Sequence, residues 1–347
     1  MKTIIITGIT GQDGSHMADF LLKDPNNFVY GAHRHLSVEN HDNIKHLKDH
    51  PRFQKIELDL TDVESINNAL KQYRPNYFIN FAANSFVGNS WKMPINHMQT
   101  NCMGVLSCLE AIKNFSSHTR FYNAGSSEQF GDVIYSPQDI NHPFRPRSPY
   151  GAAKCAAHHL VKVYRDSYNI YAVQGVLFNH EGVRRGEDFV TRKITKNVAR
   201  IYNAFILREP FLPMELGNLD AKRDWSDAED FVEGIWLMLN QDSPKEYVLS
   251  SNETHTIREF VELAFTSAGF IGEWRGEGLN ETFNDLYTGD VLVSINTKFY
   301  RPAEVELLWG DSTKARKELN WNPKTDFKGL VQKMLDNDLK EIKMERG

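Results

Sequence analysis

A tyrosine and a lysine four residues apart are the first pair in this chain whose types and spacing could do chemistry. Tyr150 and Lys154 stand in the segment 148–154, SPYGAAK, and a spacing of four brings two side chains to one face of a helix. A phenol is a poor base at neutral pH, but a neighbouring ammonium favours the phenolate. We therefore expect Tyr150 to exchange a proton with a substrate hydroxyl, although such a pair also occurs by chance.

Two serines and a glutamate form a second group that could react. Ser126, Ser127 and Glu128 follow a predicted strand that ends near Ala124, and side chains at the carboxyl end of a parallel strand point into the crevice where ligands bind. Ser126 can hydrogen-bond the oxygen that Tyr150 deprotonates. Glu128 supplies a carboxylate as a further base, and Ser127 can help to pass on a proton. The alternative for Glu128 is a helix-capping acid.

Three glycines near the start of the chain predict a dinucleotide site. The segment 7–15, TGITGQDGS, follows an apolar run and opens an amphipathic helix. The glycines allow a tight turn, a close approach of the backbone to a pyrophosphate and close packing of helix on strand, while the helix N-terminus attracts the anion. Glycines at such a turn can be purely steric, but the strand before them and the helix after them favour binding. The residues expected to contact the cofactor are Gly8, Gly11, Gln12, Asp13 and Gly14.

The end of the second predicted strand indicates which dinucleotide is bound. An NAD enzyme carries an acid there for the ribose hydroxyls, whereas residues 31–35 of this chain read GAHRH. Arg34 is therefore the candidate for the 2′-phosphate of NADP, and the alternative is a solvated surface arginine. An oxidised nicotinamide would also favour the Tyr150 phenolate. The adenine pocket and the approach to the pyrophosphate are expected at four positions that could also be turn or packing choices, namely Asp59, Leu60, Ala82 and Ala83.

The elements that must position these residues alternate between strand and helix. Apolar runs of strand length and helical patterns follow one another through the first half of the chain, which is the βαβ signature of a doubly wound parallel sheet. This pattern ends after Phe178. We expect an α/β fold with a Rossmann-like NADP-binding domain over 1–177 and a smaller α/β lobe that binds the substrate over 178–347. The segment near 217–245 is expected to return to the first domain.

Composition limits the partners and the compartment. The 347 residues are 41% hydrophobic and carry a net charge of −5, which gives no general basic footprint for nucleic acid or an anionic membrane. Glycines interrupt the opening apolar run before it reaches the length of a signal peptide or membrane span, so we expect a cytoplasmic protein. Cys102, Cys108 and Cys155 lack metal-ligand spacing. We interpret them as buried thiols and expect no metal.

Longer segments of the chain resemble the GDP-mannose 4,6-dehydratases. The resemblance spans nearly the whole sequence and includes the glycine segment at 7–15. The segments 179–181, 184–194, 217–225 and 301–305, which read NHE, RRGEDFVTRKI, GNLDAKRDW and RPAEV, extend it. The last three look particular to this family, whereas the glycine motif and the Tyr-x-x-x-Lys pair are shared by the broad short-chain dehydrogenase superfamily.

The resemblance implies a lyase that converts GDP-mannose to GDP-4-keto-6-deoxymannose. Transient hydride transfer to NADP would accompany the loss of water, and the carboxylate of Glu128 would remove the proton at C5 of the sugar. The resemblance also implies a homo-oligomer, either a dimer or a tetramer. The residues it implies for binding the GDP-sugar are Ser85, Ser127, Asn179, Lys193, Arg223, Arg301 and Glu304.

Several positions depart from the family pattern. Ser126 stands where threonine is usual, and Phe86 where histidine is common. The basic run after the second strand is reduced to His33-Arg34-His35, where the family tends to carry paired arginines and a Ser-rich loop that helps to build its tetramer. Gly182-Val183 replaces a usual Ser-Pro, Ser226-Asp227 follows Trp225 where the family has glycine and another residue, and the chain is longer than usual over 205–213. These differences leave open the exact GDP-sugar, mannose or a related sugar such as a manno-heptose, and the oligomeric state.

Two other functions fit the same motifs. An NADP-dependent nucleotide-sugar epimerase or 4-reductase has this fold but needs no carboxylate at Glu128. A non-enzymatic NADP-binding regulator need not retain Tyr150, Lys154, Ser126 and Glu128 together. Mass analysis of the product separates the dehydratase from both alternatives, because only the dehydratase releases water.

Overall fold

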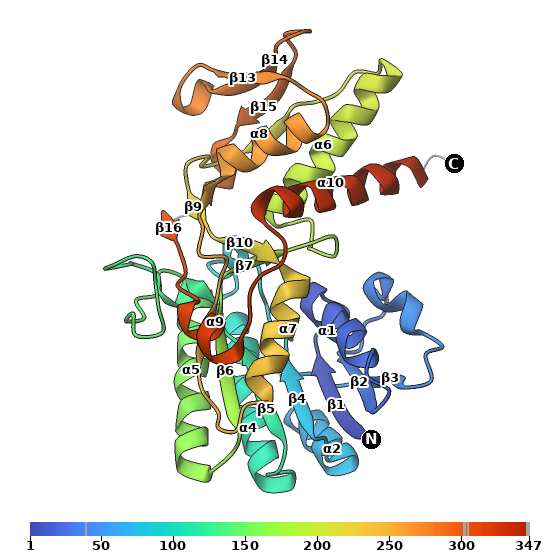
Figure 1. Cartoon of the computed structure of the whole chain (residues 1–347), viewed down its shortest axis with the longest axis vertical. Helices are drawn as coiled ribbons and strands as arrows, with labels where there is room; N and C mark the ends of the chain where they lie inside the picture. The colour runs from blue at the N-terminus through green and yellow to red at the C-terminus, as the bar shows by residue number, and fades with distance from the viewer. Residues whose placement is uncertain (39, 301–302, 304, 345–347) are drawn as a thin grey trace.

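The larger of two lobes is built on a parallel sheet of seven strands (Figure 1). The computed structural model describes residues 1–38, 40–300, 303 and 305–344. The strand order is β11-β6-β5-β4-β1-β2-β3, so the order in which strands are added to the sheet reverses between β1 and β4, as in dinucleotide-binding folds. The strands are β1 (Lys2–Thr7), β2 (Asn27–His33), β3 (Phe53–Glu57), β4 (Tyr77–Asn80), β5 (Arg120–Ala124), β6 (Ala172–Leu177) and β11 (Tyr247–Leu249).

Helices cover both faces of this sheet, which explains the continuous apolar run in the interior strand β1. Ile4 and Ile6 of β1 pack with α1, α7 and α9, while Ile5 faces α2, α4 and α5. All three isoleucines are fully buried. The helices of this lobe are α1 (Gln12–Leu22), α2 (Val63–Tyr73), α3 (Pro94–Met98), α4 (Gly104–Phe115), α5 (Pro149–Tyr168), α7 (Ala228–Leu239) and α9 (Thr313–Leu319), with a π-helical turn, Gln99–Met103, between α3 and α4.

The sequence around α5 explains why this helix begins just before Tyr150. The side chain of Ser148 caps the first turn by accepting a hydrogen bond of 3.0 Å from the Gly151 backbone N–H, and Pro149 occupies the first helical position. Both choices are typical of helix starts. The helix ends at Asn169, whose backbone is left-handed with φ of 53°. Tyr150 is thus held on the first turn of a twenty-residue helix.

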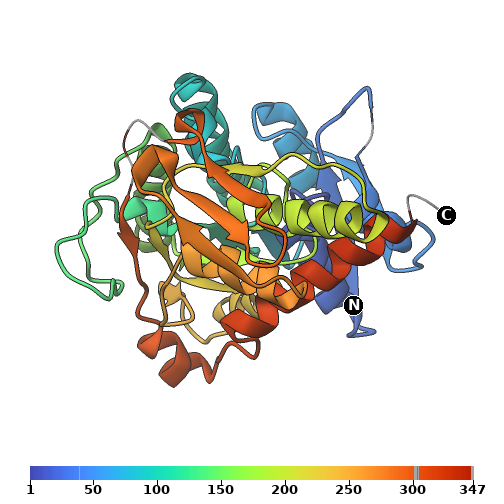
Figure 2. The same cartoon turned by 90° about the horizontal axis from the view of Figure 1, so that it is seen from above.

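The smaller lobe packs three helices against a four-stranded sheet. Its core joins apolar residues of α6 (Val190–Leu207), α8 (Ile257–Ser267) and α10 (Phe327–Met344) to the sheet residues. Figure 2 shows these helices and this sheet stacked over the end of the larger lobe. The sheet order is β13 (Gly272–Arg275), β14 (Thr282–Asp285), β15 (Val291–Ile295) and β8 (Met214–Leu216).

Short strands connect the two lobes. Two small sheets pair β7 (Asn179–Glu181) with β10 (Trp225–Asp227), and β12 (His255–Thr256) with β9 (Lys222–Arg223) and β16 (Leu307–Leu308). After β10 the chain returns to the larger lobe, because α7 packs on α1 and β11 adds to β6. Residues 315–321 share that core. We propose lobe boundaries that follow these cores, with 228–249 and 313–321 added to 1–177.

The expected doubly wound α/β fold is confirmed by this sheet and its helices. Helix α6 extends to Leu207, and Phe205 in its last turn packs on the small-lobe residue Phe270. One detail differs from expectation. Cys155 is only partly buried, unlike Cys102 and Cys108.

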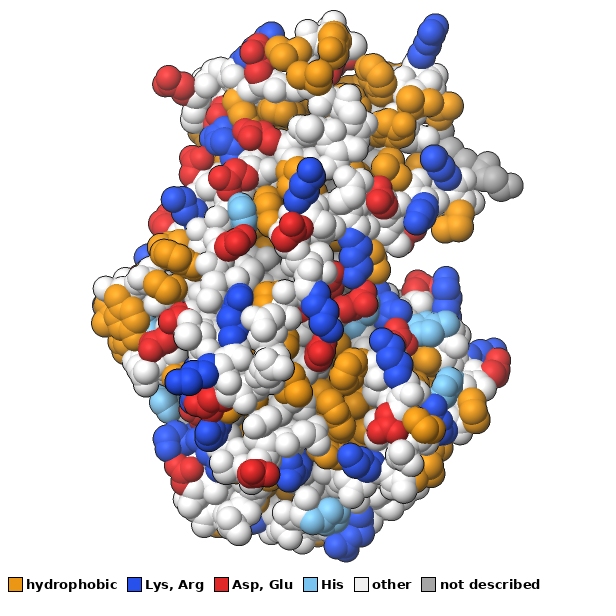
Figure 3. Space-filling model, viewed as in Figure 1, with side chains coloured by type: hydrophobic (Ala, Val, Ile, Leu, Met, Phe, Trp, Pro, Cys, Tyr) orange, Lys and Arg blue, Asp and Glu red, His pale blue; other side chains and the backbone are white. Residues whose placement is uncertain are grey.

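The surface mixes charges of both signs. Acidic and basic side chains are interspersed over the face shown in Figure 3, and apolar side chains show between them near the top, on the left and in the lower centre. Within the described ranges, no helix combines the length and apolar character that a membrane crossing requires.

Candidate active site

The glycine turn between β1 and α1 is as tight as its sequence predicts. Gly8 has a left-handed φ of 67°, and a Cβ there would lie 2.8 Å from the Ala82 backbone nitrogen. A Cβ on Gly14 would lie 2.3 Å from the Gly8 carbonyl oxygen, so neither position tolerates a side chain without movement. Gly11 is the N-cap of α1 and has no side chain to cap it. The first turn of α1 therefore keeps its N–H groups for an anionic ligand.

A buried chain of polar side chains runs across the sheet beneath the crevice. Hydrogen bonds link the Thr7 hydroxyl to Asn80 at 2.5 Å, the Asn80 amide to Asn123 at 2.8 Å and the Asn123 amide to Gln174 at 2.6 Å. The Gln174 amide then donates to Gln129 at 3.1 Å. Sequence analysis missed these residues, because single polar residues in apolar strands carry no motif.

The end of this chain holds the loop that carries Ser126. The side-chain oxygen of Gln129 accepts a hydrogen bond of 3.0 Å from the Ser126 backbone N–H, and the Ser126 hydroxyl accepts one of 3.3 Å from the Glu128 N–H. In the short 3₁₀ turn Ser127–Gln129, Ser126 and Gln129 form a capping box, in which the side chain of each accepts from the backbone N–H of the other. The turn fixes Ser126, Ser127 and Glu128 relative to the sheet. Glu128 is buried to 9% exposure even though it is ionisable.

Tyr150 and Lys154 lie beside this turn and interact with it. Burial raises the pKa of Tyr150 to about 12, against the opposing effect of a hydrogen bond with Ser126, and the carboxylate of Glu128 adds to the rise. Burial lowers the pKa of Lys154 to about 8, and its ammonium donates to the Ala124 carbonyl at 2.7 Å. The raised pKa of Tyr150 favours the protonated phenol in the protein without a cofactor. The positive charge of an oxidised nicotinamide, which the sequence analysis also expects, would favour the phenolate.

An ion pair that the sequence did not predict faces this group. Asp13 of α1 bonds His180 of β7 at 2.9 Å, and the His180 ring also contacts the Phe178 carbonyl. Although burial works in the opposite direction for each group, the pair raises the pKa of His180 and lowers that of Asp13 well below its usual range. Gln12 adds a hydrogen bond to the His180 carbonyl. The glycine turn is therefore bound to the small-lobe connection.

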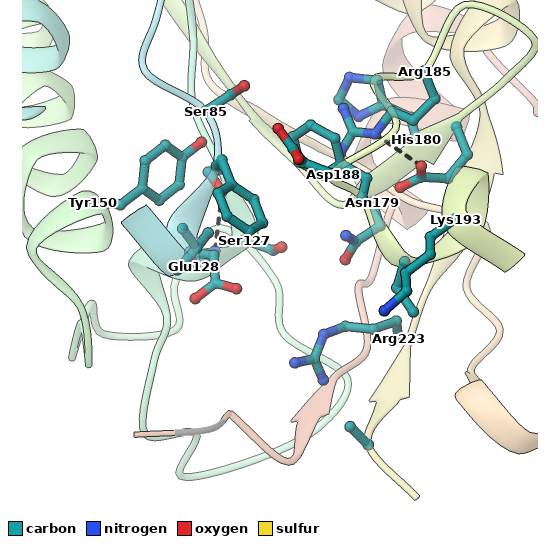
Figure 4. Close-up of a pocket in the computed structure, with 18 of the residues that line it drawn as sticks. Ser85, Ser127, Glu128, Tyr150, Asn179, His180, Arg185, Asp188, Lys193 and Arg223 are labelled. Atoms are coloured by element: carbon teal, nitrogen blue, oxygen red, sulfur yellow. Dashed lines mark hydrogen bonds and ion pairs between the residues drawn. The ribbon is translucent and has the colours of Figure 1, made fainter. Parts of the chain in front are cut away.

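Cations from the smaller lobe lie across the crevice from Tyr150 (Figure 4). The ammonium of Lys193 lies 3.2 Å from the ring centroid of Phe299, and burial together with nearby Lys298 lowers its pKa to about 8. Arg223 is buried at 6% exposure, and its guanidinium donates to the Lys222 carbonyl. Two cations desolvated in one crevice suit a diphosphate, which would offset their mutual repulsion.

One cavity of about 980 Å³ joins the two groups. This volume lies near the upper end of the range for small-molecule sites, which accommodates a nucleotide-sized ligand. The predicted residues that line the cavity are Asp13, Ala83, Ser85, Ser126, Ser127, Glu128, Tyr150, Lys154, Asn179, Lys193 and Arg223. Asn179 also has a buried side-chain oxygen without a hydrogen-bond partner in the structure.

Other predicted residues lie outside this cavity. Among the residues that the structure describes, its lining does not include Gly8, Gly11, Gln12, Gly14, Arg34, Asp59, Leu60 and Ala82. Arg34 is exposed just after β2, and Leu60 is buried against α4 near Gly104. Asp59 accepts two hydrogen bonds from Thr61, and the Ala82 N–H donates to Thr7. The predicted substrate residues Arg301 and Glu304 lie outside the described residues.

The cavity lining also includes residues that sequence analysis did not assign to the site. Arg185, Asp188, Phe189 and Phe299 belong to the smaller lobe, and Phe86, noted only as a departure from the family, belongs to the larger one. The segment RRGEDFVTRKI carried three of them, but no spacing rule placed their side chains. Within the described part of the chain, no cluster of three or more His, Cys, Asp or Glu side chains is arranged to hold a metal.

The fold is shared with solved structures that contain NAD or NADPH. A dTDP-glucose 4,6-dehydratase from Bacillus anthracis in complex with NAD superposes with a TM-score of 0.81, at 19% identity over 99% of this chain and 98% of that one. A structure named RMD from Pseudomonas aeruginosa, complexed with NADPH, gives a TM-score of 0.76 at 20% identity, over 98% of this chain and 100% of that one. At these identities the likeness confirms the Rossmann-type fold.

Sequence comparison adds the family. The model of the family described as GDP-mannose 4,6 dehydratase matches residues 5–334. The GDP-mannose 4,6 dehydratase of Drosophila melanogaster is 45% identical over 97% of this chain and 86% of its own length. That of Sinorhizobium fredii (strain HH103) is 40% identical over 99% of both chains. The chain therefore belongs to the GDP-mannose 4,6-dehydratase family.

Proposed function

We propose that this protein converts GDP-mannose to GDP-4-keto-6-deoxymannose with loss of water. The observation that carries the proposal is the arrangement of Tyr150, Ser126 and Glu128 at one side of a cavity whose other side presents Lys193 and Arg223. Such a cavity can hold a diphosphate at the cations while the sugar reaches the acid and base groups. The relatives named for this activity match nearly the whole chain.

The residues present fit a nicotinamide dinucleotide. The glycine turn leaves no room for a Cβ at Gly8 or Gly14 and offers an uncapped helix N-terminus to a pyrophosphate. Bound there, an oxidised nicotinamide would accept a hydride from C4 of the sugar and return it at C6. Its positive charge would also lower the pKa of Tyr150, which the protein alone keeps at about 12.

The protein groups divide the proton transfers between them. Tyr150 takes the proton from O4 as C4 is oxidised, and Ser126 hydrogen-bonds the same oxygen. The resulting 4-ketone acidifies C5, from which Glu128 removes a proton. The hydroxyl at C6 then leaves as water, with a proton supplied by Glu128 directly or through Ser127. When the hydride returns to C6, C5 takes up a proton by way of solvent, and this balances the proton that Tyr150 took from O4. No net oxidation results, and Glu128 is the residue that an epimerase or a 4-reductase would not need.

We further propose that the cofactor is NADP. Arg34 follows His33 at the end of β2, and the His33 ring lies 5.1 Å from that of His41. His41 in turn lies 3.1 Å from the ammonium of Lys55 on β3. The acid at the end of β3, Glu57, is paired with His35. This surface favours an added phosphate over a free ribose hydroxyl.

Replacing Arg34 tests the choice of cofactor. Arg34→Ala should weaken NADP+ binding at least about tenfold and leave NAD+ binding nearly unchanged, because only NADP+ presents the phosphate that a guanidinium can grip. Fluorescence titration with each cofactor measures both constants. Equal losses for the two cofactors would remove the support for NADP.

The oligomeric state is a separate proposal. Met103, Val163 and Tyr168, on the π-helical turn before α4 and on α5, are each about half exposed, at 51%, 51% and 50%. Apolar side chains on neighbouring helices favour burial against a second subunit, so we propose a homo-oligomer, a dimer or a tetramer. Light scattering at several protein concentrations tests this, and a monomer at all of them would overturn it.

Mass analysis of the product tests the central proposal. The purified protein is incubated with GDP-mannose and NADP+, and the nucleotide sugar is then weighed by mass spectrometry. Loss of one water is expected. A sugar product of unchanged mass would indicate an epimerase. In a second incubation with NADPH and a 4-keto nucleotide sugar, a mass gain of two hydrogens would indicate a reductase.

A further inference from the structure

The turn between β7 and α6 presents one acidic side chain to the cavity on an anchored backbone. Arg185 pairs with the buried carboxylate of Glu181 at 2.9 Å, and its guanidinium lies 3.5 Å from the ring centroid of Phe189. The Phe189 ring also meets Phe86 of the larger lobe edge to face, with centroids 6.0 Å apart. Residue 188 lies between these contacts, so its position is well defined.

The side chain of Asp188 points into the cavity. Figure 4 shows its carboxylate directed toward the side where Tyr150 and Ser85 lie, away from Lys193 and Arg223. Asp188 is exposed, and within the described residues its carboxylate makes no hydrogen bond or ion pair. Its acceptor capacity is therefore available to a ligand.

Neighbouring acids differ from Asp188 in this respect. Glu181 is bonded to Arg185 and to the Thr191 hydroxyl at 2.6 Å. Glu187 pairs with Lys196, also at 2.6 Å. Asp13, on the opposite wall, is held by His180. These acids have protein partners that account for their presence, whereas nothing in the protein accounts for an acid at Asp188.

The chemistry of a carboxylate limits what Asp188 can bind. A carboxylate would repel a diphosphate. The diphosphate is therefore expected at the cations on the other side of the cavity, away from Asp188. A carboxylate accepts hydrogen bonds from hydroxyl groups, and two oxygens can serve two adjacent hydroxyls. In the proposed reaction, Tyr150 and Ser126 engage the oxygen at C4 and Glu128 acts at C5, so the hydroxyls at C2 and C3 have no assigned partner.

We propose that Asp188 is a substrate-binding residue that determines specificity by accepting hydrogen bonds from the C2 and C3 hydroxyls of the hexose. This inference rests on the proposed function, because it assumes a sugar nucleotide in the cavity. It adds a recognition element at the sugar end, opposite the nucleotide-binding cations. The anchored turn explains how an exposed side chain can serve this purpose, since Arg185 and Phe86 hold Phe189 next to it.

Binding measurements test the role without requiring turnover. In Asp188→Ala, GDP-mannose should bind at least about tenfold more weakly, the scale of a lost hydrogen bond to a charged group. GDP should bind with unchanged affinity, because it has no hexose. The matched control is Asp290→Asn, an exposed acid of the smaller lobe outside the cavity, which should bind both ligands like the wild type. Equal weakening of GDP and GDP-mannose in Asp188→Ala would place the effect at the nucleotide and overturn the proposal.

Sugar analogues identify the hydroxyls. The wild type should lose about tenfold in kcat/KM on GDP-2-deoxymannose or GDP-3-deoxymannose, mainly through KM, whereas Asp188→Ala should lose little more on the analogues than on GDP-mannose. Two results would contradict the assignment. In one, Asp188→Ala loses as much kcat/KM as the wild type does when a deoxy analogue replaces GDP-mannose; in the other, the kcat/KM of the variant on GDP-mannose stays within twofold of the wild-type value. A wild type that binds GDP-mannose but releases no water would refute the proposed dehydration and leave the binding test of Asp188 intact.

Discussion

Alanine at Gly14 is the change whose consequence follows most directly from the coordinates. The new Cβ would lie 2.3 Å from the Gly8 carbonyl oxygen and 2.8 Å from both the Gly8 carbonyl carbon and the Ile9 Cα. All three are backbone atoms at the glycine turn, so no flexible side chain can move aside. Restoring ordinary van der Waals contact, which begins at 3.4 Å, requires α1 to move about 1 Å away from the turn.

That displacement sets the expected size of the effect. Overpacking of this kind costs about 1–3 kcal/mol, which for a protein of this size lowers the melting temperature by a few degrees. The same movement shifts the helix N-terminus that we propose for the pyrophosphate, so NADP+ affinity should fall by about tenfold or more. Differential scanning fluorimetry with and without NADP+ measures both effects, because bound cofactor raises the melting temperature according to its affinity.

Gly329→Ala in α10 is the control for this experiment. A Cβ there would meet only the side-chain oxygen of Asp326 at 3.0 Å and the Thr325 methyl at 3.4 Å. Alanine within a helix also stabilises by up to about 1 kcal/mol, so this variant should keep its melting temperature and its cofactor affinity. Wild-type stability and NADP+ affinity in Gly14→Ala would refute the reasoning about the glycine turn.

Two further changes test other parts of the site. Tyr150→Phe should lower the rate of C4 oxidation by about 10² to 10⁴, seen as no reduced cofactor on mixing with GDP-mannose, and near-normal turnover would show that another group deprotonates O4. Asp13→Asn removes the partner that raises the pKa of His180 above 6.5. The stability lost in this variant should therefore be largest near pH 5.5, where both groups are charged, and should shrink as pH rises through the raised pKa of His180. A loss in urea unfolding that stays constant to pH 9 would argue against the ion pair.

The parts of the site that the sequence predicted are those with local spacing. The three glycines and the pair Tyr150 and Lys154 each lie within one turn or one helix, so their separation along the chain determines their geometry. Ser126 and Glu128 were predicted for a similar reason, because they follow the carboxyl end of a strand. The alternating pattern of strands and helices likewise predicted the doubly wound sheet.

The site residues that the sequence pattern did not predict depend on contacts between segments distant along the chain. Asp13 and His180 are 167 residues apart, and Asn123 and Gln174 are 51 apart. Each is an ordinary polar residue until the fold brings its partner close. Burial of Tyr150, which raises its pKa, likewise depends on packing between distant segments and is not visible in a motif.

Measuring C4 oxidation and water elimination separately in Glu128→Gln tests most directly the central claim that Glu128 is the base at C5. Glutamine keeps the shape of the side chain but removes the base, so C4 oxidation should continue while elimination slows by about 10² or more. With GDP-mannose, we predict that the variant accumulates reduced cofactor and a 4-keto-hexose that keeps its C6 hydroxyl and carries no solvent deuterium at C5. The wild type and the surface control Glu64→Gln should incorporate deuterium and lose water. Release of the 4-keto-6-deoxy product by Glu128→Gln at close to the wild-type rate would contradict the assignment of Glu128 as the base at C5.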